Sequence, residues 1–284
     1  MAYFSIGGIQ LAVSSGNNLE QIILEIQLSK RKFPWLDMLV LGELSCLGPG
    51  MDACNPTYNE LVTRFCHLAK ELKIWLLPGS FYEQVDGKTY NTAPVINPAG
   101  DVIARYQKMF PFLPYESGVH PGSEFVVFEI PQVGKFGVSI CYDMWFPETT
   151  RTLVCMGAEV ILHPTMTNTL DRDVEISIAR ANAATNQCYF FDINVTGDLG
   201  AGRSVVLGPG GEVIHQAGRS SELIPVEINL EYVRRVRERG WQGLGQVLKS
   251  FRDSEVKFPI YADFEQRQKL LSHLGDLKTP TPGV

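Results

Sequence analysis

The sequence predicts an α/β protein in which two β-sheets pack together and helices cover their outer faces. The chain runs strand, helix, strand, helix and then strand hairpins, and this layout occurs twice along its length, without a sequence repeat. No linker rich in proline, glycine or serine interrupts the chain before residue 240. Each sheet must bury its apolar face against another layer, so the two halves are expected to share one core.

The first half opens with an apolar strand and an amphipathic helix. Apolar side chains recur every three to four residues from Leu19 to Phe33, after a turn at Gly16-Asn17-Asn18. The hairpin signal Pro98-Ala-Gly-Asp101 separates the last two strands. The expected strands lie at 4–13, 37–41, 74–80, 90–97 and 102–106, the helices at 19–32 and 57–72, and a loop rich in glycine and proline at 46–56.

The second half repeats the pattern and is followed by a different kind of segment. The expected strands lie at 125–130, 136–141, 158–163, 188–195, 204–207, 212–216 and 223–228, and the helices begin at Pro147 and cover 171–186 and 230–239. From Gly240 onward the chain is polar and loop-rich. We therefore expect a main domain at 1–240 and a C-terminal extension at 241–284 that packs on this domain or on a neighbouring subunit.

Composition and charge narrow the function classes. The 284 residues are 45% hydrophobic and 20% charged, which is ordinary for a globular protein. A net charge of -6 and the lack of a basic run argue against nucleic-acid binding. No apolar stretch is long enough to span a bilayer, and the beginning of the chain has no basic region typical of a signal peptide. We expect a cytoplasmic protein that binds neither nucleic acid nor membranes.

The cysteines and histidines argue against disulfides and metal. Six cysteines without a C-x-x-C pair fit a reducing compartment, and the five histidines form no H-E-x-x-H motif. No metal and no cofactor are expected. His120 and His163 are interpreted as loop or packing residues.

The stretch from Lys135 to Arg151 carries the clearest chemical signal. A short apolar run ends at Cys141, and Pro147 begins a helical pattern at a first-turn position that tolerates proline. Backbone N–H groups after a cysteine at such a turn can point at a bound oxygen, which suits a nucleophile with an oxyanion site. The alternative is a packed core cysteine, since free cysteine is among the most buried residue types.

Three further ionisable residues stand at strand ends or close to one. Glu43 follows the apolar strand at 37–41, where a partly buried carboxylate with a raised pKa would suit a general base. Lys108 leads into a segment of aromatic residues and prolines that is unusual for a surface lysine, and Glu116 lies eight residues further on as its partner. For each glutamate, the alternative is a solvated loop acid.

These residues and their order resemble the nitrilase superfamily of carbon–nitrogen hydrolases over residues 3 to 240. Glu43, Lys108 and Cys141 are similar to its Glu-Lys-Cys triad, and Glu116 is similar to its second glutamate. The supporting segments are Asp37-Met-Leu-Val-Leu-Gly-Glu43, Ala104-Arg-Tyr-Gln-Lys108, Gly137-Val-Ser-Ile-Cys141-Tyr-Asp, Phe146-Pro-Glu148, Gly157-Ala-Glu-Val-Ile161, Arg180-Ala-Asn-Ala-Ala-Thr-Asn-Gln-Cys188 and Gly210-Gly-Glu-Val213. The resemblance implies a four-layer α-β-β-α sandwich that assembles into homo-oligomers, dimers or larger.

Local departures indicate a branch within the superfamily. Gly42 stands where proline usually precedes the first glutamate, and we expect a looser turn there. The run Lys108-Met-Phe-Pro-Phe-Leu-Pro-Tyr-Glu116 is similar to aliphatic amidases and formamidases. Trp145-Phe-Pro-Glu148 resembles some N-carbamoyl amidases, whereas Tyr142-Asp143 speaks against true nitrilases, which usually carry Trp-Glu after the cysteine.

The resemblance implies hydrolysis of a small amide through a thioester. Cys141 would attack the carbonyl carbon while Glu43 takes its proton, and Lys108 with the Tyr142 N–H would stabilise the oxyanion. Glu116 would hold Lys108 in place. An N-carbamoyl amidohydrolase or a nitrilase is the enzymatic alternative, and a binding or scaffold protein that retained the fold is the non-enzymatic one.

The aromatic residues near the cysteine suggest a narrow acyl pocket. Phe112, Tyr142 and Trp145 are the expected substrate-binding side chains, because they lie close in sequence to the catalytic residues. Such a pocket favours small, uncharged aliphatic amides over acyl groups that carry a carboxylate. No motif places an arginine to bind a carboxylate, although Arg172 or Arg203 could lie near the site in the fold.

Overall fold

Two sheets form the centre of the molecule, in a computed structural model that describes residues 3–50, 57–113 and 115–278. The first sheet has the order β15-β1-β3-β4-β6-β5, with β7 paired to β6, and the second has the order β14-β13-β11-β10-β9-β8. Seven strands form the first sheet: β1 (Tyr3–Gln10), β3 (Met38–Leu41), β4 (Trp75–Leu77), β5 (Phe81–Val85), β6 (Lys88–Ile96), β7 (Val102–Gln107) and β15 (Glu222–Asn229). Six form the second: β8 (Val126–Ile130), β9 (Gly134–Val138), β10 (Val160–Thr165), β11 (Tyr189–Asn194), β13 (Val205–Leu207) and β14 (Val213–Gln216).

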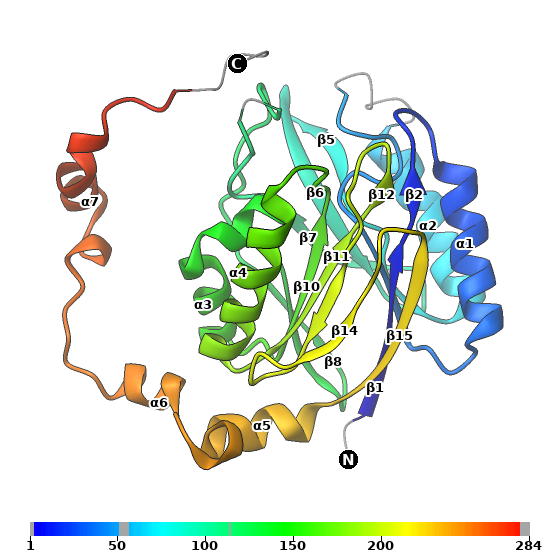
Figure 1. The fold of residues 1–284 in the computed structure, drawn as a ribbon. Coiled ribbons are helices and arrows are strands. Elements are labelled where there is room, and N and C mark those ends of the chain that lie inside the picture. The colour runs from blue at the N-terminus through cyan, green and yellow to red at the C-terminus, as the bar shows by residue number, and fades with distance from the viewer. Residues whose placement is uncertain (1–2, 51–56, 114, 279–284) are drawn as a thin grey trace.

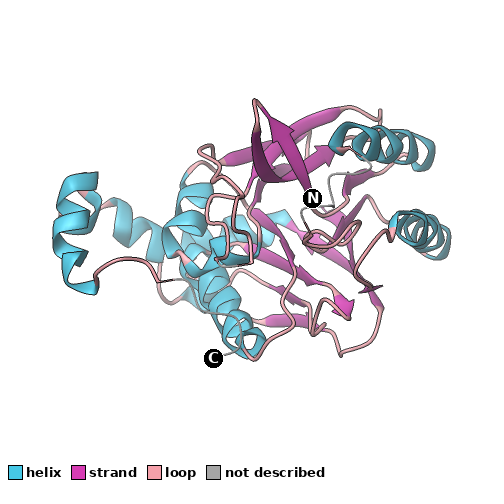
Figure 2. Cartoon of the chain, turned by 90° about the horizontal axis from the view of Figure 1, so that it is seen from above, coloured by secondary structure: helices cyan, strands magenta, loops and turns pink. Residues whose placement is uncertain are grey.

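Helices cover the outer face of each sheet. Helices α1 (Leu19–Lys32) and α2 (Tyr58–Leu72) lie against the first sheet, and α3 (Pro147–Cys155) and α4 (Asp171–Asn186) lie against the second (Figure 1). From above, the strands stand between two groups of helices (Figure 2). The expected four-layer α-β-β-α sandwich is confirmed.

Three apolar clusters correspond to the three interfaces between these layers. One lies between the sheets, where Val40 of β3 and Ile6 of β1 belong to the same cluster as Leu162 of β10. A second joins α1 and α2 to the first sheet, and a third joins α3 and α4 to the second. In the cluster between the sheets, apolar side chains from the two sheets pack against each other. Burial of these side chains stabilises the sandwich.

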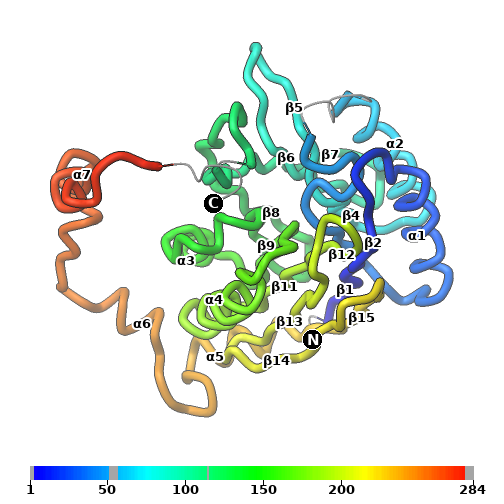
Figure 3. Tube along the Cα trace, turned by 45° about the horizontal axis from the view of Figure 1, so that its top comes forward, coloured from blue at the N-terminus to red at the C-terminus, as the bar shows by residue number. Residues whose placement is uncertain are grey.

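Strands from the two ends of the main domain lie side by side. β1 pairs with β15 along its full length, from Tyr3 opposite Asn229 to Gln10 opposite Glu222 (Figure 3). The small sheet of β2 (Ala12–Val13) and β12 (Thr196–Gly197) joins the two halves in the same way. These pairings connect residues about two hundred positions apart in the sequence, so paired strands join the two halves of the chain.

Several expected elements differ from the structure. The opening strand at 4–13 is divided into β1 and β2, and β5 forms a hairpin with β6 that was not expected. The strand expected to end at Cys141 ends at Val138, and Cys141–Trp145 is a 3-10 turn. The described residues do not include 51–56, the part of the predicted loop that contains Cys54. They also do not include Pro114 and residues 279–284.

The segment after α5 (Leu230–Arg239) is not a simple loop. It contains α6 (Val247–Arg252) and α7 (Phe264–Leu271), and it runs outward as an arm beside the main domain (Figure 1). Leu248 packs against the cluster of α3 and α4, whereas residues 251–278 are exposed. No helix in the described part of the chain is long and apolar enough to cross a membrane.

Candidate active site

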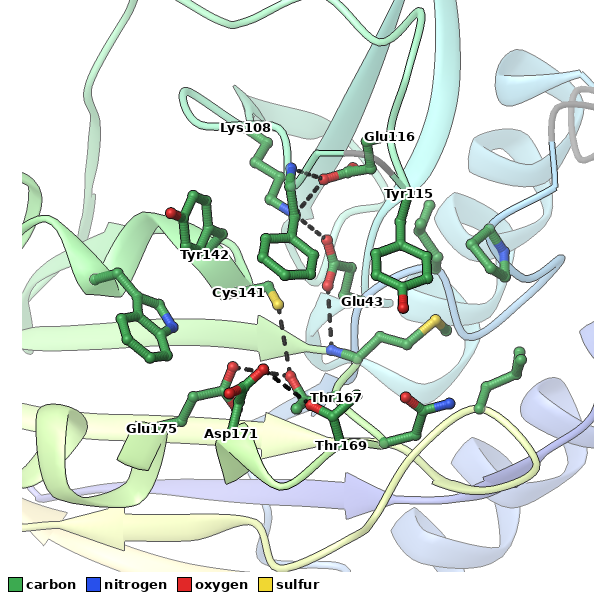
Figure 4. A pocket seen from close by; sticks show the side chains of 17 residues that line it. Glu43, Lys108, Tyr115, Glu116, Cys141, Tyr142, Thr167, Thr169, Asp171 and Glu175 are labelled. Carbon is green, nitrogen blue, oxygen red and sulfur yellow. Dashed lines mark hydrogen bonds and ion pairs between the residues drawn. The ribbon is translucent and has the colours of Figure 1, made fainter. Parts of the chain in front are cut away.

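The four residues expected to be catalytic come together where the ends of strands from both sheets meet (Figure 4). Glu43 follows β3 and Lys108 follows β7 in the first sheet, while Cys141 follows β9 in the second. Glu116 reaches the same point from the loop after β7. All four line one cavity of about 240 Å³.

Lys108 is held between the two glutamates. Its Nζ lies 2.8 Å from Glu43 Oε1 and 2.6 Å from Glu116 Oε2, and the Lys108 side chain is 1% exposed. Burial opposes the charge of Lys108, but the carboxylates of Glu43 and Glu116 outweigh this effect and raise the pKa of the ammonium well above its ordinary value. Lys108 is therefore a fixed cation and not a base.

Asn91 joins the two glutamates and was not identified from the sequence. Its Nδ2 donates to Glu43 Oε1 at 2.9 Å and to Glu116 Oε1 at 2.8 Å. The backbone of Asn91 also contacts Lys108, since the Lys108 N–H donates a hydrogen bond to the Asn91 carbonyl oxygen at 2.9 Å. The available signal was an asparagine inside the expected strand at 90–97, because asparagine is depleted in strands.

The carboxyl group of Glu43 has the environment of a general base. Its Oε2 accepts a hydrogen bond from the Met166 N–H at 3.1 Å, which orients the group from the second sheet. Burial raises the pKa of Glu43, and Glu116 adds to this while Lys108 opposes it. A carboxylate whose pKa lies above the ordinary range can accept a proton more readily.

Cys141 stands at a strained turn. Its φ is 46°, in the left-handed region that non-glycine residues seldom adopt, and such strain is typical of functional positions. The Sγ lies 3.8 Å from Thr167 Oγ1. Burial and the neighbouring Glu43 raise the pKa of the Cys141 thiol well above its ordinary value. The resting sulfur is therefore a thiol that needs a base to become a nucleophile.

Asp143 fixes the turn that carries Cys141. Its Oδ2 accepts from the Ile140 N–H at 2.9 Å and from the Tyr106 hydroxyl at 2.6 Å, and its Oδ1 accepts from the Phe110 N–H at 3.0 Å. Burial raises the pKa of Asp143 to about 6. The sequence motif contained this residue, but its structural role comes from partners on β7 and the loop after it.

The expected substrate-binding residues all line the cavity. Phe112, Tyr142 and Trp145 form an aromatic wall, in which the rings of Phe112 and Tyr142 are 5.0 Å apart and those of Tyr142 and Trp145 are 6.1 Å apart. The volume of about 240 Å³ is small for a ligand site.

Neither arginine considered for carboxylate binding lines the cavity. Arg172 is buried and pairs with Asp192 at 2.8 Å, and Arg203 pairs with Asp173. His163 is buried behind the site, where its Nδ1 lies 2.7 Å from Ser139 Oγ, and burial lowers its pKa to about 4. His163 is thus a packing residue. In the described part of the chain, no group of three or more possible ligands is arranged to hold a metal ion.

The turn at Gly42 is closely packed, so the expectation of a looser turn was wrong. A Cβ at this position would lie 2.6 Å from Val195 Cγ1 and 3.0 Å from the Thr165 carbonyl oxygen. Thr165 is the last residue of β10 in the second sheet, and Val195 directly follows β11 of the same sheet. Glycine at residue 42 therefore allows the backbone before Glu43 to approach the second sheet. There the Glu43 N–H donates a hydrogen bond to the Thr165 carbonyl oxygen at 3.2 Å.

Sequence comparisons find relatives of this chain that are named as amidases. Over 196 residues the chain is 32% identical to omega-amidase NIT2 of Xenopus tropicalis, which covers 64% of this chain and 71% of that protein. It is 32% identical over 200 residues to deaminated glutathione amidase of Dictyostelium discoideum, covering 63% of this chain and 68% of that protein.

A solved structure and a family model extend the match. Saccharomyces cerevisiae Nit3, a member of branch 10 of the nitrilase superfamily, superposes with a TM-score of 0.76 at 27% identity, covering 84% of this chain and 94% of Nit3. The family model of carbon-nitrogen hydrolases matches residues 9–238. The chain therefore belongs to the carbon-nitrogen hydrolase family of the nitrilase superfamily.

Proposed function

We propose that this protein is an amidase that cleaves the C–N bond of a small linear amide through a thioester, releasing a carboxylic acid and ammonia. The observation that carries the proposal is the strained, buried Cys141 in one small cavity with the Glu43–Lys108–Glu116 cluster. A nucleophile, a base and a fixed cation within one cavity are the parts that acyl transfer requires.

In the first half-reaction, Glu43 takes the Cys141 proton as the sulfur attacks the carbonyl carbon. The electron pair of the C=O bond moves to oxygen, and the oxyanion is stabilised by Lys108 and the Tyr142 N–H. This N–H lies in the first turn of the 3-10 helix, where backbone donors lack an intrahelical acceptor. Glu43 then gives its proton to the departing nitrogen, the C–N bond breaks, and the thioester remains.

In the second half-reaction, a water molecule replaces the released ammonia. Glu43 takes a proton from this water as its oxygen attacks the thioester carbonyl carbon. The C–S bond breaks, the proton returns to the sulfur, and the acid leaves. Glu116 and Asn91 act as positioning residues, since both contact the Glu43–Lys108 pair.

The cavity supports small, uncharged acyl groups over those that carry a carboxylate. Its volume is about 240 Å³, and the one cation among its described lining residues, Lys108, is already paired with two carboxylates. A substrate carboxylate would lose its water without gaining a partner, which is costly. The preference proposed for this chain rests on its own lining residues and not on the names of the omega-amidase relatives.

A substrate panel tests the proposal. We expect ammonia release from acetamide and propionamide with a higher kcat/KM than from the ω-amide of a dicarboxylic acid, an N-carbamoyl amine or a nitrile. Faster turnover of the carbamoyl compound or the nitrile would favour those alternatives. A scaffold protein would release no ammonia from any member of the panel.

Replacing Glu116 with glutamine should slow turnover about tenfold to a hundredfold and change its pH dependence. Glu116 raises the pKa of Glu43, which must be deprotonated to act as the base, so wild-type kcat/KM falls as pH drops through this raised pKa. Removing the Glu116 charge lowers the pKa of Glu43 and moves the acid limb to lower pH. The measurement is kcat/KM against pH.

The hydrogen bonds of Glu116 show that glutamine is not a neutral substitute. Oε1 accepts from Asn91, and Oε2 accepts from Lys108 and from the Phe112 N–H, so either amide orientation sets an NH2 group against a donor. Some loss of stability is therefore expected in addition to the loss of turnover. Glu124→Gln, an exposed acid in the same loop, is the control and should leave the profile unchanged. An unchanged profile for Glu116→Gln would make Glu116 structural only.

We also propose that the protein forms homo-oligomers, as its superfamily resemblance implies. The arm after α6 exposes large apolar side chains that include Phe258, Tyr261 and Phe264. Side chains of this kind are commonly covered by another surface. Sedimentation of the full chain should give a multiple of 31.6 kDa. A monomer at micromolar concentration would contradict the proposal.

A further inference from the structure

The cavity carries more negative than positive charge. Among the described residues that line it, four are carboxylates and one is a cation, Lys108. Glu43 and Glu116 are paired with this lysine. Asp171 and Glu175, at the start of α4, are the remaining two acids. They are not needed for the steps of hydrolysis described above.

Glu175 is a buried carboxylate without a full counter-charge. It is 3% exposed and accepts a hydrogen bond from the Thr167 hydroxyl at 2.9 Å. Arg172 approaches it at 3.3 Å but lies closer to Asp192, at 2.8 Å, so one guanidinium faces two carboxylates. Burial and then Asp192 raise the pKa of Glu175 despite Arg172. A cation placed beside Glu175 would therefore be stabilised.

These acids stand on a different side of the nucleophile from the lysine. Figure 4 shows Glu175, Asp171 and Thr167 together below the Cys141 sulfur, with Lys108 above it. Thr167 Oγ1 lies 3.8 Å from Cys141 Sγ and 2.9 Å from Glu175 Oε1. A single hydroxyl thus separates the sulfur from the carboxylate. A substituent a few carbons from the scissile carbonyl would reach these acids.

We propose that the enzyme selects linear amides whose acyl chain ends in a cationic group, an ammonium or a guanidinium, with Glu175 as the specificity-determining residue and Asp171 assisting it. The inference rests on the proposed amidase function of the same cavity. A cation there gains the attraction of two acids, a neutral end gains nothing from them, and a carboxylate is repelled. The cation binds in a place that the Glu43–Lys108 pair does not occupy.

Three amides of similar size test the charge preference. 4-Aminobutanamide carries an ammonium, pentanamide has a methyl group at the same place, and succinamate carries a carboxylate. We expect kcat/KM for 4-aminobutanamide to be about tenfold above that for pentanamide, and succinamate to be about tenfold below pentanamide. Ammonia release is measured at neutral pH and low salt, and the ratios should shrink as salt is added.

Two variants locate the origin of the preference. Glu175→Gln keeps the size and an oxygen for Thr167, and it should reduce the ratio of 4-aminobutanamide to pentanamide to within about twofold of unity. Asp173→Asn is the matched control, because this exposed acid of the same helix pairs with Arg203 and does not line the cavity. Its ratio should equal that of the wild type.

The outcomes separate this inference from the proposed function. Equal or slower turnover of 4-aminobutanamide by the wild type, with pentanamide hydrolysed, overturns the inference alone. A preference that survives Glu175→Gln overturns the role of Glu175. If Glu175→Gln does not fold, Asp171→Asn replaces it, and an undiminished ratio in that variant counts against cation binding by Asp171 and Glu175. No ammonia from any of the three amides counts against the amidase function itself.

Discussion

Replacing Cys141 with alanine is expected to abolish amide turnover, lowering kcat by about four orders of magnitude or more. The thioester cannot form without the sulfur, and the remaining groups only polarise the carbonyl. The fold should survive, because one thiol is a small packing loss at a residue that is still 7% exposed. The measurement is kcat on the best amide, together with thermal unfolding.

Cys188→Ala is the matched control for this variant. Cys188 is fully buried in the cluster of α3 and α4 and does not line the cavity. This variant should lose some stability and retain its kcat. Turnover by Cys141→Ala within a few-fold of the wild type would refute the nucleophile assignment, and so would a comparable loss of kcat in both variants.

Replacing Lys108 with methionine should lower both activity and stability. The change leaves Glu43 and Glu116 buried without the cation that lies 2.8 and 2.6 Å from them. Breaking a buried ion pair from one side typically costs about 3–5 kcal/mol. Loss of the oxyanion donor should reduce kcat at least about a hundredfold to a thousandfold. Denaturant unfolding and steady-state kinetics measure the two effects.

The stability loss in Lys108→Met should depend on pH in a defined direction. Burial raises the folded-state pKa of Glu43 and Lys108 lowers it, so without the lysine this pKa rises further above its unfolded value. The folded state then binds protons more tightly than the unfolded state, so the variant gains stability relative to the wild type as pH falls. Lys135→Met, at an exposed position of β9, is the control. Equal unfolding free energies for Lys108→Met and the wild type would contradict the buried cluster.

The helices could be predicted from sequence because their signals are local. The expected bounds of α1, α4 and α5 agree with the structure. A repeated apolar face marks α1 and α5, whereas the buried side of α4 carries polar residues that include Arg172 and Glu175. The short elements were harder. β5 is buried only at Phe81, Tyr82 and Glu83, and its Asp86-Gly87 turn was the missed hairpin signal. α7 lacks buried residues, so it had no apolar pattern to reveal it.

The site could be predicted only in part. Glu43, Lys108 and Cys141 were identified because each follows a strand or a motif that can be read locally. The contacts of Asn91 with Glu43 span 48 residues of sequence, and those of Asp143 with Tyr106 span 37. No local pattern encodes such contacts. The position of Glu175 in the cavity likewise depends on how α4 packs against its sheet.

The division of the site between the two sheets has a consequence for folding. Glu43, Asn91 and Lys108 come from the first sheet and its connections, whereas Cys141 and Thr167 follow strands of the second. A chain in which one sheet has formed alone holds either a base without a nucleophile or a nucleophile without a base. Chemical competence therefore arises only when the two sheets dock, and recovery of activity during refolding reports that final assembly step rather than the formation of either half.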